Sequence, residues 1–160
     1  MAQRIGIIGG GQLGRMLAVA AKKLGFFVIV LDPTPESPAG QVADFQIVGN
    51  FKDEQAILDL ARQVDFLTFE IESANVSVLK EIAKSGLPVN PSAETLEIIK
   101  DKFRQKQFLK TAEIPTAQFR EVKNSNDIKK AAEVFGYPLL LKARFDAYDG
   151  KGNHVIGRED

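Results

Sequence analysis

Short apolar runs alternate with amphipathic stretches through residues 1–93. The runs IGII, FFVIVL, QIV and DFLTFE are typical of β-strands. FFVIVL is almost uninterrupted apolar sequence, as expected of a parallel strand covered by helices on both faces. Apolar residues at helical spacing predict helices at about 12–24, 53–63 and 75–84. This order predicts a βαβ fold with a parallel sheet of four or five strands, the last formed by LPVNP.

The first predicted helix has apolar residues at intervals of three and four, which predicts one apolar face against the sheet. Gly25 is a suitable residue to end it. The side chains expected on the buried face are Leu13, Met16, Leu17, Ala20, Ala21 and Leu24.

A charged helical stretch at residues 94–113 is predicted to connect this domain to a second one, and Pro115 ends it. In the second domain, at 114–160, AQFREV and PLLLKA are predicted strands. The helix between them begins at Ser125 or Asn126, which are good capping residues. Its predicted buried face consists of Ile128, Ala131, Ala132 and Phe135.

The composition excludes several classes of protein. The 160 residues include 21 basic and 21 acidic side chains, so no net charge attracts nucleic acid or an anionic membrane surface. The absence of cysteine excludes disulfides and zinc–thiolate sites. The apolar run Ile5–Ile8 is too short to span a membrane. We therefore predict a soluble cytoplasmic protein without nucleic-acid or membrane partners.

The first glycine-rich segment fits G-x-G-x-x-G through Gly9, Gly11 and Gly14, between a predicted strand and a predicted helix. Three interpretations are open. The segment is typical of NAD-binding folds, with Asp32 placed to bind a ribose. It is also what a tight strand-to-helix turn needs without any ligand. Finally, the helix N-terminus could hold a phosphate-bearing substrate, to which Gln12 could donate its amide.

The second glycine-rich segment, DAYDGKGN, is not a Walker A motif, because Phe145 and Gly152 stand where glycine and Ser or Thr are required. Its glycines allow a flexible hairpin that can close over phosphates, and Lys142 on the preceding strand supplies a positive charge. The simpler interpretation is an ordinary hairpin with a surface lysine. His154 has no second metal ligand nearby and is interpreted as a surface histidine.

Six segments, in this order, resemble the N-terminal part of the N5-carboxyaminoimidazole ribonucleotide synthase family, ATP-grasp enzymes of purine biosynthesis. The resemblance covers essentially the whole chain. The segments are IGIIGGGQLGRML, LDPTPESPAGQVAD, FLTFEIE, PSAETLEIIKDKFRQKQFL, IPTAQF and GYPLLLKARFDAYDGKGN.

The resemblance implies an α/β chain: a Rossmann-like pre-ATP-grasp domain followed by the start of an ATP-grasp domain. It implies a carbon–nitrogen ligase that uses ATP, Mg²⁺ and bicarbonate to carboxylate aminoimidazole ribonucleotide through carboxyphosphate. The metal ligands are expected beyond Asp160, so we assign none and expect an N-terminal fragment that is inactive alone. A homodimer is a further implication of the resemblance.

The resemblance also assigns functional residues by position. Lys102 in IIKDKF, Lys142 in LLLKA and the loop Ala147–Asn153 are the expected ATP contacts. Within the loop, these contacts are Ala147, Tyr148, Asp149, Gly150, Lys151, Gly152 and Asn153, of which Tyr148, Asp149 and Lys151 are the expected catalytic residues. The expected substrate-binding residues are Gly11, Gln12, Leu13, Glu70 and Glu72.

Glu70 and Glu72 are two positions apart and would share one face of a strand, where they could act as a general acid–base pair. A strand-end ion pair or two solvated carboxylates is the simpler interpretation. Other functions also remain open: a different ATP-grasp ligase or transformylase, an NAD-binding Rossmann module, or a non-catalytic interaction domain.

Overall fold

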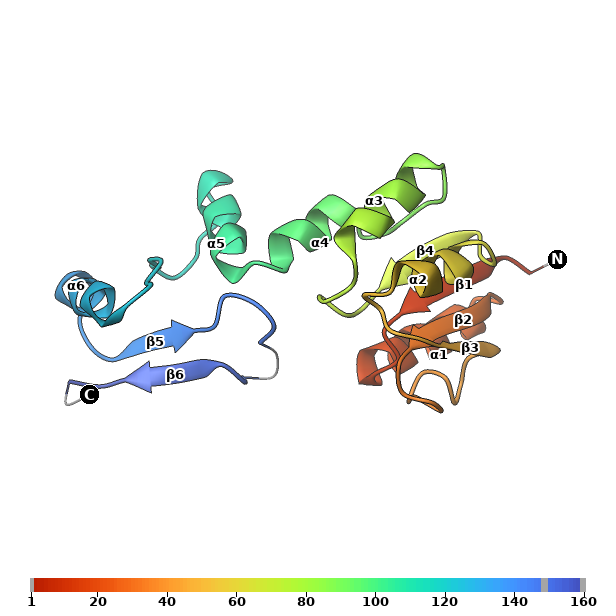
Figure 1. Cartoon of the computed structure of the whole chain (residues 1–160), viewed down its shortest axis with the longest axis horizontal. Coiled ribbons are helices and arrows are strands. Elements are labelled where there is room, and N and C mark those ends of the chain that lie inside the picture. The colour runs from red at the N-terminus through yellow and green to blue at the C-terminus, as the bar shows by residue number, and fades with distance from the viewer. Residues whose placement is uncertain (1, 148–149, 159–160) are drawn as a thin grey trace. The chain divides into compact units, whose positions relative to one another are not determined.

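The structure is a computed structural model that describes residues 2–147 and 150–158. Its contacts divide the chain into two compact units, Met1–Glu97 and Ile98–Asp160. Figure 1 labels the elements in chain order, and each unit contains a sheet of its own.

The first unit is built on a four-stranded sheet in the order β3-β2-β1-β4, in which every pairing is parallel. Four strands of the predicted sheet are thereby confirmed. The segment predicted as a possible fifth strand makes a single bridge, between Leu67 and Val89. The strands are β1 (Arg4–Ile8), β2 (Phe27–Asp32), β3 (Phe45–Val48) and β4 (Phe66–Phe69).

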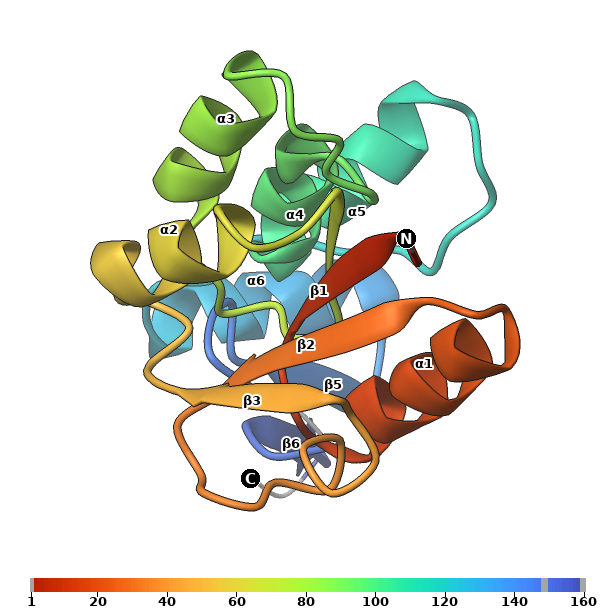
Figure 2. The same cartoon turned by 90° about the vertical axis from the view of Figure 1, so that its right-hand side faces the viewer.

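Helices cover both faces of this sheet, because alternate residues of a strand point to opposite sides. Ile7 and Val28 belong to the core cluster that faces α1 (Gln12–Lys23). On the opposite face, a Cβ added to Gly6 would lie 3.1 Å from Leu60 of α2 (Glu54–Ala61), so that helix packs closely against β1. Figure 2 shows α1 and α2 on the two sides of the sheet.

The predicted buried face of α1 is wrong. The helix packs on the sheet through the small residues Gly14, Ala18 and Ala21, of which only Ala21 was predicted to be buried. Small side chains let a helix lie close to a sheet, whereas larger ones would hold it away. The large apolar side chains point outward: the exposed fractions are 60% for Leu13, 60% for Met16, 41% for Leu17 and 78% for Leu24.

Short polar residues begin the next two helices. The Asp53 carboxylate accepts a hydrogen bond from the amide N–H of Gln55 at the start of α2. The Asn75 side chain does the same for Val78 at the start of α3 (Val76–Lys84). Each cap satisfies a backbone donor that has no partner within the helix.

The predicted connecting helix at 94–113 is two helices, α4 (Ala93–Ile99) and α5 (Lys102–Thr111). Asp101 lies between them with extended backbone, at φ −108° and ψ 104°. Its carboxylate accepts hydrogen bonds from the amides of Phe103 and Arg104, so a new helix begins there.

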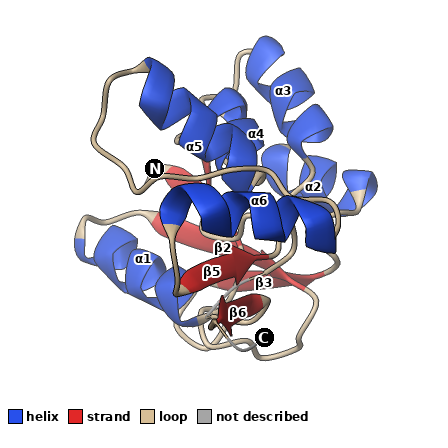
Figure 3. Cartoon of the chain, turned by 90° about the vertical axis from the view of Figure 1, so that its left-hand side faces the viewer, coloured by secondary structure: helices blue, strands red, loops and turns tan. Residues whose placement is uncertain are grey.

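The second unit contains an antiparallel hairpin of β5 (Leu139–Lys142) and β6 (Asn153–Ile156), with α6 (Ser125–Phe135) beside it in Figure 3. The cap of α6 is Asn124, which accepts a hydrogen bond from the Asp127 amide, so the predicted caps were one or two residues late.

The segment AQFREV, at 117–122, is irregular rather than a strand. The sheet of this unit consists of β5 and β6 within the described residues, and that segment pairs with neither of them. Of the four residues predicted to form the buried face of α6, Ala131 and Ala132 are buried, while Ile128 and Phe135 are partly exposed.

Candidate functional site

The first glycine-rich segment forms a tight turn between β1 and α1. Gly9 has φ +105°, a conformation that side chains other than glycine rarely adopt. A Cβ on Gly14 would lie 2.2 Å from the carbonyl oxygen of Gly9, so this position also requires glycine. Gly11, at φ −69°, has ordinary backbone geometry. Two of the three glycines therefore have a structural reason that involves no ligand.

Asp32 holds this turn in place. Its carboxylate is buried, with one oxygen 2.8 Å from the amide nitrogen of Gly10 and the other 2.8 Å from that of Thr34. Both oxygens thus accept hydrogen bonds from the protein's own backbone. In an NAD-binding fold this carboxylate would be directed at ribose hydroxyls. The geometry of Asp32 therefore argues against the nicotinamide interpretation.

Glu70 also lies at the start of α1. Its Oε1 accepts a hydrogen bond from the Gly11 amide at 3.2 Å, and the side chain is half-buried. Burial raises the pKa of Glu70, and the neighbouring negative charge of Asp32 raises it further. Hydrogen bonds from the backbone of Gly11 and Gly14 act in the opposite direction without reversing the shift. Glu70 therefore takes up a proton more readily than an exposed glutamate does.

The two carboxylates change what this turn can bind. Asp32 and Glu70 already accept from the Gly10 and Gly11 amides, which a phosphate at this helix end would use. A phosphate there would also face two acidic side chains. The half-buried Glu70 can instead accept a hydrogen bond from a hydroxyl or amine group of a ligand.

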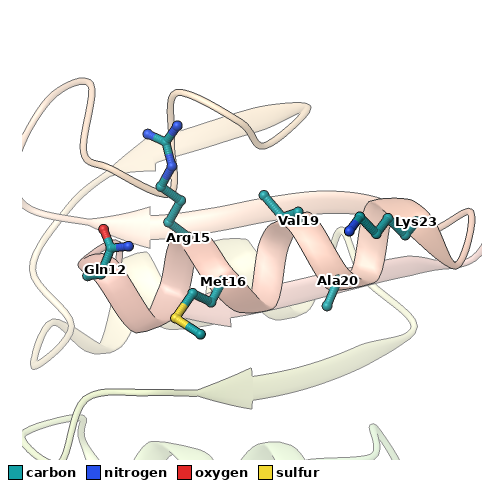
Figure 4. A pocket seen from close by; sticks show the side chains of 6 residues that line it. All are labelled: Gln12, Arg15, Met16, Val19, Ala20 and Lys23. Carbon is teal, nitrogen blue, oxygen red and sulfur yellow. The ribbon is translucent and has the colours of Figure 1, made fainter.

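Gln12 and Leu13 begin α1, and both have exposed side chains. Gln12 stands at one end of a surface hollow of about 310 Å³ on the outer side of the helix, shown in Figure 4. The other side chains that line this hollow come from the same helix: Arg15, Met16, Val19, Ala20 and Lys23.

Glu72 was predicted to lie on a strand beside Glu70, but it lies after the strand. β4 ends at Phe69, so Glu70 and Glu72 both follow the strand and do not share a strand face. The spacing argument for an acid–base pair therefore does not apply.

In the second unit, the start of α5 meets the β5–β6 hairpin. The backbone N–H of Lys102 donates to the carbonyl oxygen of Arg144 at 3.1 Å. The Lys102 ammonium lies 2.5 Å from the carbonyl oxygen of Ala147. Lys142 ends β5 opposite Asn153 of β6, with an exposed side chain. The structure thus brings Lys102 and Lys142, which are far apart in the sequence, to one hairpin.

Glycine is required in the turn of this hairpin. Gly150 and Gly152 both have φ +77°, and the Gly152 carbonyl accepts a hydrogen bond from the Ala143 amide at 2.8 Å. A Cβ on Gly152 would lie 2.9 Å from the Cβ atoms of both Ala143 and Ala147. Lys151 is exposed, whereas the predicted catalytic residues Tyr148 and Asp149 lie outside the described residues.

Arg144 and Asp101 are the residues of this region that sequence reasoning missed. Arg144 donates to both carboxylate oxygens of Asp101, at 2.7 Å and 2.6 Å. The Arg144 guanidinium lowers the pKa of Asp101 below its ordinary range. The sequence offered one partial signal, because an aspartate directly before a helix is a common cap. Nothing in the sequence relates Asp101 to a residue 43 positions away.

The described residues contain neither a metal-binding cluster nor a membrane-spanning helix. Within 2–147 and 150–158, no three His, Cys, Asp or Glu side chains gather closely enough to hold a metal ion. In the same part of the chain, each helix is too short or too polar to cross a bilayer.

Comparisons with known proteins agree with this architecture. Residues 1–100 match the family described as the ribonucleotide synthetase preATP-grasp domain, and residues 107–160 match the ATP-grasp domain. With the parallel sheet and its helices, these matches confirm the predicted fold class.

Individual relatives are much longer than this chain. N5-carboxyaminoimidazole ribonucleotide synthase of Staphylococcus aureus is 41% identical over 97% of the chain, which spans 41% of that protein. The crystal structure of the corresponding synthetase from Thermotoga maritima has 47% identity and a TM-score of 0.85, over 99% of this chain and 42% of that one.

A third similar structure contains ligands. It is the N5-carboxyaminoimidazole synthase of Aspergillus clavatus in complex with ADP and 5-aminoimidazole ribonucleotide. Its TM-score is 0.86 at 38% identity, over 99% of this chain and 42% of that chain.

Proposed function

Because this chain belongs to the ribonucleotide synthetase preATP-grasp domain family, we propose that it is part of an ATP-grasp carbon–nitrogen ligase of purine biosynthesis. The reaction is the ATP- and bicarbonate-dependent carboxylation of aminoimidazole ribonucleotide to N5-carboxyaminoimidazole ribonucleotide. The relative from S. aureus carries that name, and the A. clavatus relative holds ADP and the ribonucleotide. The proposed domains are 1–93, a connecting segment at 94–113, and 114–160.

The observation that carries the proposal is the contact of Lys102 with the glycine-rich hairpin, whose first strand ends at Lys142. One ammonium group on the hairpin and another on α5 in contact with it, together with glycines whose amides can approach a ligand closely, suit the phosphates of a nucleotide. We propose that Lys102, Lys142 and the loop Ala147–Asn153 contact ATP. Tyr148, Asp149 and Lys151 would lie nearest the carboxyl group in transfer.

In the first unit, we propose that Gly11, Gln12, Leu13, Glu70 and Glu72 bind the ribonucleotide. A hydrogen-bond donor of the ribonucleotide fits this turn, because the half-buried Glu70 presents a carboxyl group there. Burial raises the pKa of Glu70, which favours its protonated form more than in an exposed glutamate, and its unprotonated form can accept a hydrogen bond from a ligand donor.

The proposed reaction has two steps. A bicarbonate oxygen attacks the γ-phosphorus of ATP, and ADP leaves, which forms carboxyphosphate. The ribonucleotide amine then attacks the carboxyl carbon, or CO₂ released from carboxyphosphate; phosphate leaves and the amine loses a proton. The contribution of the protein is to position the reactants and to stabilise charge on the transferred group.

Mg²⁺ does not fit the residues that the structure describes, because they contain no acidic cluster of the kind that holds this ion. We propose that the metal ligands belong to parts of the longer relatives that this chain does not span. No step of the proposed reaction is assigned to the metal. We also propose a cytoplasmic homodimer, as the family resemblance implies; sedimentation of the purified chain would test the dimer.

Binding of ATP by the purified chain tests the first part of the proposal. We expect Lys102→Met and Lys142→Met each to weaken ATP binding about tenfold, since each removes a charge-assisted contact. Lys129→Met, at an exposed position of α6, is the matched control and should bind as the unaltered chain does. Equal affinities for all four proteins would refute the assignment of the two lysines.

We expect catalysis to need more of the relatives' length than this chain spans. A chimaera in which residues 1–160 replace the matching part of the S. aureus relative should release phosphate from ATP when bicarbonate and the ribonucleotide are present. Stimulation by formate instead of bicarbonate would support a transformylase. The 160-residue chain by itself should show no turnover, and ribonucleotide-stimulated phosphate release by that chain would contradict this expectation.

A further inference from the structure

Arg144 links the start of α5 to the β5–β6 hairpin. Its Nε and Nη2 atoms donate to the two oxygens of Asp101, at 2.7 Å and 2.6 Å. Its Nη1 donates to Glu121 Oε1 at 2.6 Å. Each guanidinium nitrogen therefore has a carboxylate partner, which makes Arg144 a poor candidate for a direct phosphate contact.

Two aromatic rings hold the same guanidinium. Its central carbon lies 5.3 Å from the centre of the Phe103 ring and 5.2 Å from that of Phe145. A planar guanidinium can stack on rings and grip a carboxylate with two parallel hydrogen bonds, and an ammonium can do neither. The orientation of Arg144 is thus fixed by contacts on several sides.

Asp101 is the buried end of this link. It accepts four hydrogen bonds: two from Arg144 and two from the amides of Phe103 and Arg104 in the first turn of α5. Its side chain is 12% exposed, and its pKa is lowered chiefly by the hydrogen bonds from Arg144. Asp101 therefore fixes the start of α5 relative to Arg144.

Lys102 lies between these two residues and the loop. Its backbone N–H donates to the carbonyl oxygen of Arg144, and its ammonium lies 2.5 Å from the carbonyl oxygen of Ala147. The lysine follows Asp101 directly in the chain. Its position is consequently set by the Asp101–Arg144 pair on one side and by the start of the loop on the other.

We propose that Arg144 is a positioning residue, which, paired with Asp101, holds the Lys102 ammonium where it can serve the nucleotide phosphates. Arg144 acts through Lys102 and does not touch the nucleotide. This inference rests on the proposed function, because it assigns to Lys102 the role of a phosphate contact.

Three substitutions separate positioning from simple structural support. Arg144→Gln removes the pair. Asp101→Asn retains an oxygen that can cap α5 and loses the charge that Arg144 grips. Glu121→Gln is the matched control, because it removes a carboxylate partner of the same guanidinium on the exposed side.

We expect Arg144→Gln and Asp101→Asn each to weaken ATP binding by the purified chain about tenfold, and Glu121→Gln to change it less than about twofold. In a Lys102→Met background, Arg144→Gln should have no further effect, since two changes that act through one contact are not additive. Binding in that background should be followed up to millimolar ATP, because the contact from Lys142 remains.

Amide hydrogen exchange provides a readout that does not depend on the nucleotide. Arg144→Gln should abolish protection of the Lys102 amide, while Glu121→Gln should preserve it. If Arg144→Gln prevents folding, ATP binding and exchange of the Lys102 amide are both measured in Asp101→Asn instead.

Two results would overturn the inference. One is that Arg144→Gln lowers ATP affinity equally in the unaltered chain and in the Lys102→Met background; the other is that Arg144→Gln and Asp101→Asn both leave ATP affinity unchanged. If the unaltered chain binds no ATP, the proposed function fails for this chain. The hydrogen-exchange measurement then tests by itself whether Arg144 holds Lys102 in place. Unchanged protection of the Lys102 amide in Arg144→Gln refutes this, and loss of protection in Arg144→Gln but not in Glu121→Gln supports it.

Discussion

The Glu70 carboxylate accepts a hydrogen bond from the Gly11 amide at 3.2 Å, across the turn that begins α1. Burial and the charge of Asp32 raise the pKa of Glu70. In the folded protein the Glu70 carboxyl group therefore stays protonated at pH values where it has already ionised in the unfolded chain. The stability of the fold is therefore expected to fall as the pH rises from the ordinary glutamate value of 4.5 to the raised pKa.

Glu70→Gln tests this expectation, because the amide keeps an oxygen for Gly11 and cannot ionise. As the pH rises from about 4 to about 7, the unfolding free energy of this variant should increase relative to that of the unaltered chain, because only the unaltered chain is destabilised by ionisation of Glu70. Urea unfolding at a series of pH values measures the difference, with Glu72→Gln as the control. A difference that stays constant across this range would contradict the assigned pKa shift.

Gly14 is expected to tolerate no side chain. A Cβ there would meet the Gly9 carbonyl oxygen at 2.2 Å, and backbone cannot move aside as a flexible side chain can. We expect Gly14→Ala to destabilise the chain by about 2–4 kcal/mol. Gly11→Ala is the control, since the nearest atom is the flexible end of Glu70 at 3.2 Å, and it should cost less than about 1 kcal/mol. Similar losses in the two variants would count against the close contact.

The two sides of α1 should respond oppositely to substitution. Met16 is 60% exposed, so Met16→Gln should change the unfolding free energy by about 0.5 kcal/mol or less. Ala18 is fully buried against the sheet, so Ala18→Leu should cost about 1–3 kcal/mol through overpacking. Denaturant titration of both variants measures their unfolding free energies. A larger loss of stability for Met16→Gln than for Ala18→Leu would contradict the packing of the Ala18 side of α1 on the sheet.

The hairpin turn offers a matched pair of glycines. Gly150 and Gly152 share φ +77°, but only the second would bring a Cβ within 2.9 Å of neighbouring atoms. Gly150→Ala should therefore cost about 1–2 kcal/mol from its backbone conformation, and Gly152→Ala should cost more. Thermal unfolding followed at the hairpin resonances compares them, and equal losses would show that crowding at Gly152 has no effect.

In the first unit, the four strands and most helix ends could be predicted because their signals are local. FFVIVL is apolar enough to identify a doubly covered strand, and Asp53 and Asn75 are ordinary caps. The orientation of α1 could not be predicted from apolar spacing, because both sides of that helix are apolar. The size of the side chains decided it, since only Gly14, Ala18 and Ala21 permit a close approach to the sheet.

In the candidate site, too, local features could be predicted from the sequence and contacts between distant segments could not. A lysine before a glycine loop is visible in the sequence, and the hairpin at Lys142 is confirmed as structure. The pairing of Arg144 with Asp101 depends on contacts between distant segments, which periodicity cannot reveal. Likewise, the sequence allows Asp32 as a ribose ligand, whereas in the fold its two oxygens accept hydrogen bonds from the Gly10 and Thr34 amides.

The geometry of this turn also bears on protein engineering. A redesign that aimed to give the fold a dinucleotide cofactor could not succeed by altering the cofactor-facing loop alone. Asp32 would first have to release Gly10, and Glu70 would have to release Gly11, so at least two acidic positions on different strand ends must change together. The glycine pattern by itself is therefore an insufficient template for grafting nicotinamide specificity.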